Sequence, residues 1–209
     1  MKNFDIDKWN RKDQYDFFKN YEDPFFNLTA NLEVTILYDY CKKNAFSFSL
    51  TCLFFALKGM NEITEFKLRI VDNKVVIFDK IHLGSTILNS DNTFSFCYFN
   101  YKNDLLKFIE EACVVLEQNR NKTQFEPKEN VIDLAHCSTL PWLSFTGFKH
   151  AKKGDERHTG IPKLVFGKMF ELNNKRMLPF SVEVHHALMD GLHVANLFEI
   201  IQDSIDHLA

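Results

Sequence analysis

The C-terminal part of the chain places a strand pattern directly before a helix pattern. The stretch 178–185 (LPFSVEVH) is rich in apolar and β-branched residues and favours a strand. From Asp190 or Gly191 onward, apolar residues recur at the spacing of an amphipathic helix. The residues of this apolar stripe are Val194, Leu197, Phe198, Ile201 and Ile205. A strand followed at once by such a helix favours an α/β fold, in which helices cover a sheet.

The same alternation of strands and helices runs through the rest of the chain. We expect helices over residues 11–19, 37–43, 49–62 and 104–118. We expect strands over residues 27–35, 66–71, 75–78, 84–88, 93–99, 132–138, 143–148 and 163–170. No repeat, linker or shift in composition divides the sequence. Residues 1–209 are therefore expected to form one domain, with a mixed sheet and helices packed on it.

Charge and cysteine content argue against several classes of protein. The formal net charge is -3 with scattered lysines and arginines, which argues against nucleic acid as the main partner. The 5 cysteines form no Cys-x-x-Cys pair, so neither a zinc site nor a disulfide framework is expected. The N-terminus is polar, and no apolar stretch approaches the roughly 18 residues that a membrane span needs. We therefore expect a cytoplasmic protein without a membrane segment.

Two histidines end the C-terminal strand, and an aspartate and a glycine follow. His186 would stand at the end of a rigid strand, where an imidazole can serve as a general base near neutral pH. Asp190 would brace the loop that holds it, whereas His185 and His193 are expected to pack or hydrogen-bond beside it. The His-x-x-x-Asp spacing alone is a weak signal. Other metal-ligand candidates are not clustered in sequence, so no metal site is expected.

Three segments together resemble one enzyme family. The run 185–194 (HHALMDGLHV) resembles the chloramphenicol acetyltransferase signature His-His-Ala-Val-x-Asp-Gly-Phe-His-Val. Residues 138–145 (STLPWLSF) are similar to the Ser-Ala-x-Pro-Trp-x-x-Phe segment of that family. Residues 9–12 (WNRK) are similar to its N-terminal Trp-x-Arg-Lys/Arg motif. The order and spacing of the three segments agree along nearly the whole chain.

The resemblance implies an architecture and a co-substrate. The family fold is a two-layer α/β sandwich with a mixed β-sheet, assembled as a homotrimer. Each active site lies at a subunit interface, where the histidine of one subunit faces a pocket of its neighbour. Acetyl-CoA would be a co-substrate, and no cofactor would be bound permanently. The implied reaction is O-acetylation of the primary hydroxyl of chloramphenicol.

The resemblance also implies a role for each matching residue. His186 would take the proton from the acceptor hydroxyl, which then attacks the acetyl-CoA thioester directly. Asp190 would pair with Arg11 to hold the loop, and the hydroxyl of Ser138 would stabilise the oxyanion, an effect worth roughly 2.7–4 kcal/mol in analogous sites. The residues expected to bind the acceptor are Phe17, Phe18, Phe25 and Thr93. Those expected to bind CoA are Trp142 and Lys168.

Some positions depart from the family pattern and leave the acceptor open. Phe18 lacks the phenolic hydroxyl of the tyrosine found there in the family, Val165 stands at the place of a threonine, and Met169 at the place of a tyrosine. Three hypotheses follow: acetylation of chloramphenicol, the same chemistry on another alcohol or amine, and a non-catalytic trimeric protein that binds a ligand.

Overall fold

The computed structural model describes residues 1–120, 125–128, 130–152 and 159–208. The helices are α1 (Lys12–Phe18), α2 (Thr35–Asn44), α3 (Phe48–Glu62), α4 (Leu105–Asn119) and α5 (Gly191–Asp206), with short 3-10 turns η1 (Ile6–Lys8) and η2 (Glu65–Lys67). The strands are β1 (Lys2–Asn3), β2 (Phe25–Glu33), β3 (Leu68–Val71), β4 (Lys74–Ile77), β5 (His82–Leu88), β6 (Phe94–Phe99), β7 (Leu134–Thr139), β8 (Lys163–Phe166), β9 (Phe170–Leu172) and β10 (Lys175–His185).

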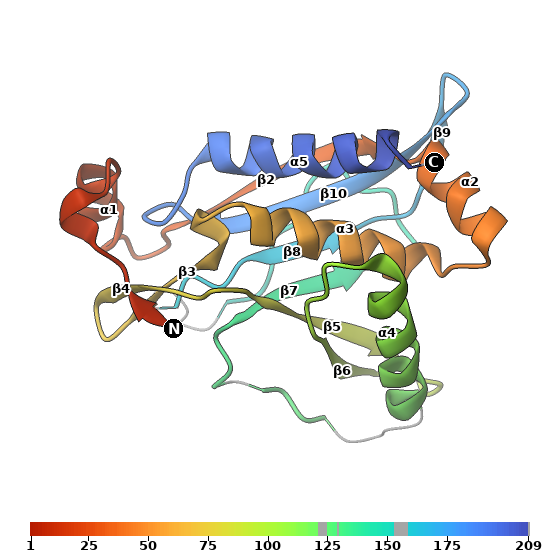
Figure 1. Ribbon diagram of the computed structural model, residues 1–209, viewed down its shortest axis with the longest axis horizontal. Coiled ribbons are helices and arrows are strands. Elements are labelled where there is room, and N and C mark those ends of the chain that lie inside the picture. The colour runs from red at the N-terminus through yellow and green to blue at the C-terminus, as the bar shows by residue number, and fades with distance from the viewer. Residues whose placement is uncertain (121–124, 129, 153–158, 209) are drawn as a thin grey trace.

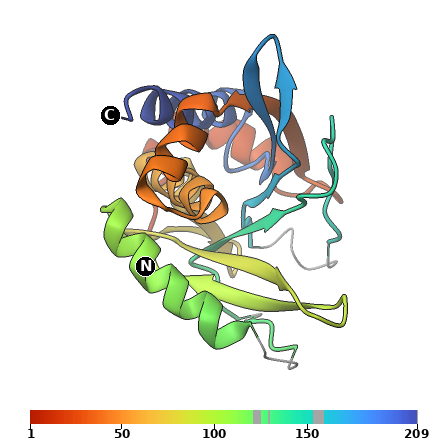
Figure 2. The ribbon, with the colours of Figure 1, turned by 90° about the vertical axis from the view of Figure 1, so that its right-hand side faces the viewer.

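The main sheet is mixed, as predicted. Its strand order is β2-β10-β8-β7-β5-β6, and β9 pairs with β10 beside this path. Strand β7 runs parallel to both β5 and β8, whereas the other pairs of this sheet are antiparallel. A smaller antiparallel sheet has the order β1-β4-β3. Figure 1 shows helices α3 and α5 running across the main sheet, and Figure 2 shows the helices gathered on one side of the strands.

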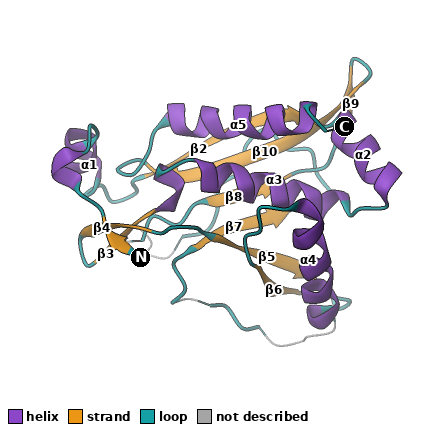
Figure 3. Cartoon of the chain, viewed as in Figure 1, coloured by secondary structure: helices purple, strands orange, loops and turns teal. Residues whose placement is uncertain are grey.

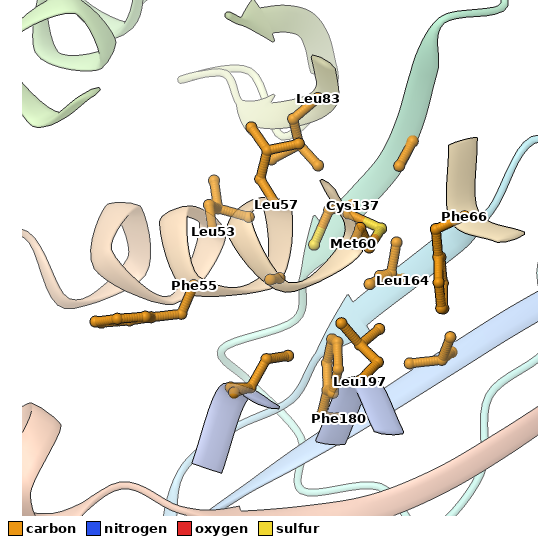
Figure 4. Packing of buried hydrophobic residues seen from close by; sticks show 14 of the residues in the cluster. Leu53, Phe55, Leu57, Met60, Phe66, Leu83, Cys137, Leu164, Phe180 and Leu197 are labelled. Atoms are coloured by element: carbon orange, nitrogen blue, oxygen red, sulfur yellow. The ribbon is translucent and has the colours of Figure 1, made fainter. Parts of the chain in front are cut away.

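The core lies between the helices and the main sheet. Alternate residues of β10, namely Phe180, Val182 and Val184, are fully buried in the hydrophobic cluster. Figure 4 shows Phe180 close to Leu197 of α5. Because strand side chains alternate between faces, Ser181, Glu183 and His185 lie on the opposite face of the sheet. The expected two-layer α/β arrangement is therefore confirmed: in the described part of the chain, the helices α3 and α5 cover one face of the main sheet (Figure 3).

Two expected strands differ most from the structure, and the expected strand 66–71 begins only at Leu68, because residues 65–67 form η2. Residues 143–148 form no strand, because they have no neighbouring strand to pair with, and of their side chains only Phe145 is buried. The expected strand 163–170 is interrupted after Phe166, where the N–H of Gly167 donates to the carbonyl of Pro179 at 2.9 Å. The chain then resumes as β9 and pairs with the beginning of β10, which starts three residues earlier than expected.

Other predicted elements agree closely with the structure. Strands β3 and β4 pair as a hairpin, whose turn holds Asp72 and Asn73 at φ 48° and 59°. Helix α4 begins after Asp104, whose side chain accepts the N–H of Lys107. In the described part of the chain, no helix combines the length and apolar character that crossing a membrane requires.

Candidate active site

The loop between β10 and α5 is fixed by its own backbone. The N–H groups of Leu188 and Met189 donate to the carbonyl of His185 at 3.0 and 3.1 Å, which closes a tight turn. The N–H of His186 donates to the carbonyl of Pro24 at 2.8 Å. Ala187, Leu188 and Met189 are completely buried. The loop therefore holds His186 in one position at the end of the strand.

Arg11 joins this loop to the N-terminal part of the chain. Its Nη1 donates to the carboxylate of Asp190, and its Nη2 donates to the backbone carbonyl of His186 at 3.1 Å. Arg11 is only 7% exposed. Burial acts to raise the pKa of Asp190, but the charges of Arg11 and His193 outweigh it, so this pKa lies below its ordinary value. The pair of Arg11 and Asp190 implied by the resemblance is thus present in the structure.

The imidazole of His186 is held in an orientation that suits a base. Its Nδ1 lies 3.3 Å from the carbonyl oxygen of Met189. A carbonyl oxygen can only accept, so this contact requires the proton on Nδ1 and leaves the lone pair on Nε2. Phe18 stacks on the ring at 3.9 Å between centroids with 11° between planes, and Phe26 packs at 4.7 Å. The arrangement can remove a proton from a hydroxyl placed at Nε2.

Ser138 lies elsewhere, on the outer face of the sheet. It stands on β7 opposite Val165 of β8, which in turn stands opposite Ser181 of β10. The hydroxyl of Thr86, on β5, lies 3.5 Å from that of Ser138. Val165 stands at the position that carries a threonine hydroxyl in the family, so this position is apolar here. Its side chain is completely buried.

The histidine and the serine of one chain do not meet. Two strand spacings of about 4.8 Å separate β7 from β10, and five residues of about 3.3 Å each separate Ser181 from His186. The two side chains are therefore roughly 19 Å apart along the sheet. Strands β8 and β10 are antiparallel, so His186 lies beyond the beginning of β8 and Ser138 lies near its end.

The residues expected to bind the acceptor divide between these two places. Phe17 packs on Phe18 at 4.9 Å and is 62% exposed, and Phe25 packs edge-on against the buried His185 at 5.1 Å. These aromatic residues surround the histidine end of the sheet. Thr93, in contrast, lies in the turn between β5 and β6, where its hydroxyl donates to Asp91 at 2.6 Å. The structure does not bring Thr93 to His186.

The residues expected to bind CoA lie at the serine end. The N–H of Lys168 donates to the carbonyl of Leu143, and the hydroxyl of Ser144 donates to the carbonyl of Lys168 at 2.7 Å. These contacts bring the segment after β7 against the segment after β8. Trp142 is 62% exposed on the first segment, and Lys168 is exposed on the second. Both side chains are therefore accessible near the strand that carries Ser138.

Three residues of the site were missed from the sequence. Phe26 contacts the imidazole of His186, Thr86 neighbours Ser138, and Glu65 reaches His193. Strand register places Thr86 and Phe26, and the packing of η2 against α5 places Glu65, so no local motif marks them. Across the described ranges, no group of three or more His, Cys, Asp or Glu side chains is arranged to hold a metal ion.

Comparison with known proteins identifies the family. The family model of chloramphenicol acetyltransferase matches residues 1–202. A chloramphenicol acetyltransferase of Proteus mirabilis is 28% identical over 97% of this chain and 93% of its own length. One from Clostridium butyricum is 31% identical over 95% of this chain and 92% of its own length. A solved structure of a chloramphenicol acetyltransferase superposes with a TM-score of 0.90 at 27% identity, covering 97% of this chain and 98% of its own. This chain belongs to the chloramphenicol acetyltransferase family.

Proposed function

We propose that this protein transfers the acetyl group of acetyl-CoA to the primary hydroxyl of chloramphenicol. One observation carries the proposal: the contact of Nδ1 of His186 with the Met189 carbonyl leaves the lone pair of Nε2 available as a base. Relatives over nearly the whole chain are named chloramphenicol acetyltransferase. We further propose that residues 1–209 work as one acyltransferase domain.

The proposed reaction proceeds without an acyl-enzyme. Nε2 of His186 takes the proton of the acceptor hydroxyl while the oxygen attacks the thioester carbonyl of acetyl-CoA. The hydroxyl of Ser138 donates to the oxyanion of the tetrahedral intermediate. When the carbon–sulfur bond breaks, the proton on His186 passes to the leaving thiolate, which gives CoA and the acetyl ester. His186 ends in its starting state.

We propose that the enzyme is a homotrimer with shared sites. A single chain holds His186 and Ser138 roughly 19 Å apart, which is too far for both to act on one acceptor. If His186 of one subunit approaches the outer sheet face of its neighbour, it meets Ser138 there. The aromatic residues Phe17, Phe18 and Phe25 would then contact the acceptor from the histidine side. Trp142 and Lys168 would contact CoA from the serine side.

The test is the release of CoA thiol from acetyl-CoA, with and without chloramphenicol. The wild type should release thiol in a chloramphenicol-dependent manner, and His186→Ala should abolish this release. His207→Ala is the matched control, because His207 lies at the far end of α5 and bonds the carbonyl of Asp203. The absence of chloramphenicol-dependent thiol release at high enzyme concentration would refute the proposed acceptor.

A second candidate is the same chemistry on another alcohol or amine. It is favoured by the apolar Phe18 ring stacked directly on His186 and by the fully buried Val165. Both positions lack a hydroxyl with which the acceptor pocket could bind a polar group or a water molecule. A screen of acceptors by thiol release distinguishes the two candidates. If chloramphenicol gives the highest kcat/KM, the second candidate is wrong.

A further inference from the structure

His193, in the first turn of α5, lies between two carboxylates. Its Nδ1 is 2.9 Å from Oδ1 of Asp190, and its Nε2 is 3.6 Å from Oε1 of Glu65 in η2. The side chains of His193 and Glu65 are 15% and 18% exposed, so salt and water screen their interaction weakly. A ring with an acid at each nitrogen is arranged to carry a positive charge.

The contacts of Nδ1 distinguish two protonation states of the ring. The backbone N–H of Asp190 points at Nδ1 of His193 from 3.1 Å, a hydrogen bond that an unprotonated Nδ1 accepts. The 2.9 Å contact with the Asp190 carboxylate requires a proton on the same nitrogen. One nitrogen cannot make both bonds at once. The charged ring therefore binds the Asp190 carboxylate, whereas a ring that lacks the Nδ1 proton caps the backbone and releases this carboxylate.

Asp190 connects this ring to the general base. The Asp190 carboxylate also accepts from Arg11, and Arg11 donates to the backbone carbonyl of His186. Glu65, His193, Asp190 and Arg11 thus form a row of alternating negative and positive charges. Glu65 faces His193 from η2, Asp190 faces it from the loop before α5, and Arg11 lies in the segment before α1. The row ends on the backbone of His186.

We propose that His193 and Glu65 are a positioning pair for His186, in which the charged ring holds the Asp190 carboxylate in place for Arg11. The inference rests on the proposed function, because the pair acts on the reaction only through His186. Neither is a catalytic residue. Glu65 keeps the ring charged, and the charged ring keeps the loop in its working geometry.

The pair has a defined pH range. The neighbouring carboxylate of Glu65 raises the pKa of His193, and the same contact lowers the pKa of Glu65. Stabilisation from the histidine is complete below its ordinary pKa of 6.5 and is lost as pH rises through its raised pKa. Stabilisation from the glutamate is present above its ordinary pKa of 4.5 and is lost as pH falls. Alkali discharges His193, so kcat should decline as pH rises through the raised pKa of this ring.

The test is the pH profile of kcat for chloramphenicol acetylation in the wild type, His193→Gln, Glu65→Gln and the double variant. In His193→Gln the alkaline decline should disappear, and kcat at pH 7 should be about tenfold lower with little change in KM. In Glu65→Gln the alkaline decline should move to lower pH by about one unit. The double variant should be no worse than His193→Gln, because the two residues share one interaction.

His207→Gln, directly after the last residue of α5, is the matched control and should keep the wild-type profile. An alkaline decline unchanged in His193→Gln would overturn the proposal. If His193→Gln lowered kcat by the same factor at every pH and also lowered Tm, the proposal would likewise be overturned, because the role of His193 would then be purely structural. NMR titration of the His193 ring, identified by its absence in His193→Gln, needs no turnover. A raised pKa that falls in Glu65→Gln supports the pair even if chloramphenicol is not acetylated, and an ordinary pKa in the wild type contradicts it.

Discussion

At the scale of single residues, the fold fixes His186 on several sides. Phe18 covers one face of its ring, the Met189 carbonyl holds Nδ1, and Arg11 holds its backbone carbonyl. In the proposed mechanism, this preorganisation removes the need to orient the base during the reaction. Ser138, in contrast, stands beside the hydroxyl of Thr86 on a pleated strand. In the proposed mechanism, its contribution is a hydrogen bond that strengthens as negative charge develops on the thioester oxygen.

Ser138→Ala should therefore lower kcat by about 100-fold and leave KM nearly unchanged, because an oxyanion donor acts mainly in the transition state. Steady-state kinetics with chloramphenicol and acetyl-CoA measures both constants. Thr86→Val is the matched control: it removes the neighbouring hydroxyl, keeps the side-chain shape, and should cost less than about tenfold in kcat. If kcat of Ser138→Ala equals that of the wild type, Ser138 has no part in the chemistry.

Individual site residues differ in how far the sequence could predict them. The contact of Arg11 with Asp190 joins two motifs and was implied by the resemblance, and the structure contains it. Thr93 was expected to bind the acceptor, and it lies in the turn between β5 and β6. The threonine beside Ser138 is Thr86, which no motif marked. Only the register of β5 against β7 determines which threonine lies there. When strand register brings two side chains together, no local sequence pattern predicts their contact.

At the scale of elements, a buried arginine ties the small sheet to the main one. Arg69 of β3 is completely buried and donates to the carbonyls of Phe66, Leu68, Ile132 and Leu134 at 2.6–2.9 Å. Burial lowers its pKa to about 9, so the guanidinium is still charged at neutral pH. One side chain thus joins η2 and β3 to the chain entering β7, the strand that carries Ser138.

Arg69→Met should lower the free energy of unfolding by about 3–5 kcal/mol, because it leaves several buried carbonyls without their donor. Urea unfolding followed by circular dichroism measures this. Arg176→Met is the matched control: its guanidinium pairs with Asp39 at the surface, and its loss should cost about 1 kcal/mol or less. Equal losses in the two variants would show that the buried hydrogen bonds of Arg69 contribute little.

Elements were predicted best where periodicity and end signals agree. Helix α4 has an apolar stripe and a capping Asp104, and its predicted bounds differ by one residue at each end from the observed helix. Residues 143–146 alternate apolar and polar residues like a strand, but a strand also needs a partner along its edge. In the structure this segment contacts the chain after β8 through the Leu143 carbonyl. The spacing of apolar residues indicates which side chains are buried, but it does not indicate whether a neighbouring strand is available for pairing.

At the scale of the whole molecule, the separation of His186 from Ser138 is the feature that no local sequence pattern predicts. Both motifs are recognised in the sequence, and only the sheet order and register show that they lie roughly 19 Å apart in one subunit. In the proposed trimer each reaction needs the histidine of one subunit and the serine of the next. A defect in His186 and a defect in Ser138 would then affect different sites.

Mixed trimers of His186→Ala and Ser138→Ala chains should therefore regain activity. With equal amounts and random assembly, about a quarter of all sites would contain both intact side chains, and in the isolated mixed trimers about a third of the sites would do so. Two affinity tags isolate the mixed species, and thiol release measures its activity relative to the wild type. Each variant refolded with itself is the control and should remain at its own low level. Isolated mixed trimers that stay inactive would show that the two residues do not share a site across subunits.

The pairing of β2 with β10 has a consequence for synthesis on the ribosome. Residues 25–33 form an edge strand whose neighbour in the sheet is residues 177–185, and Arg11 likewise pairs with Asp190. A nascent chain therefore carries an unpaired β2 edge and an unpaired guanidinium until nearly all of its codons have been translated. Unpaired strand edges invite association with other chains. We therefore expect aggregates when translation stops or stalls near the 3′ end of the message. Chaperones that shield β2 during translation should raise the yield of active enzyme.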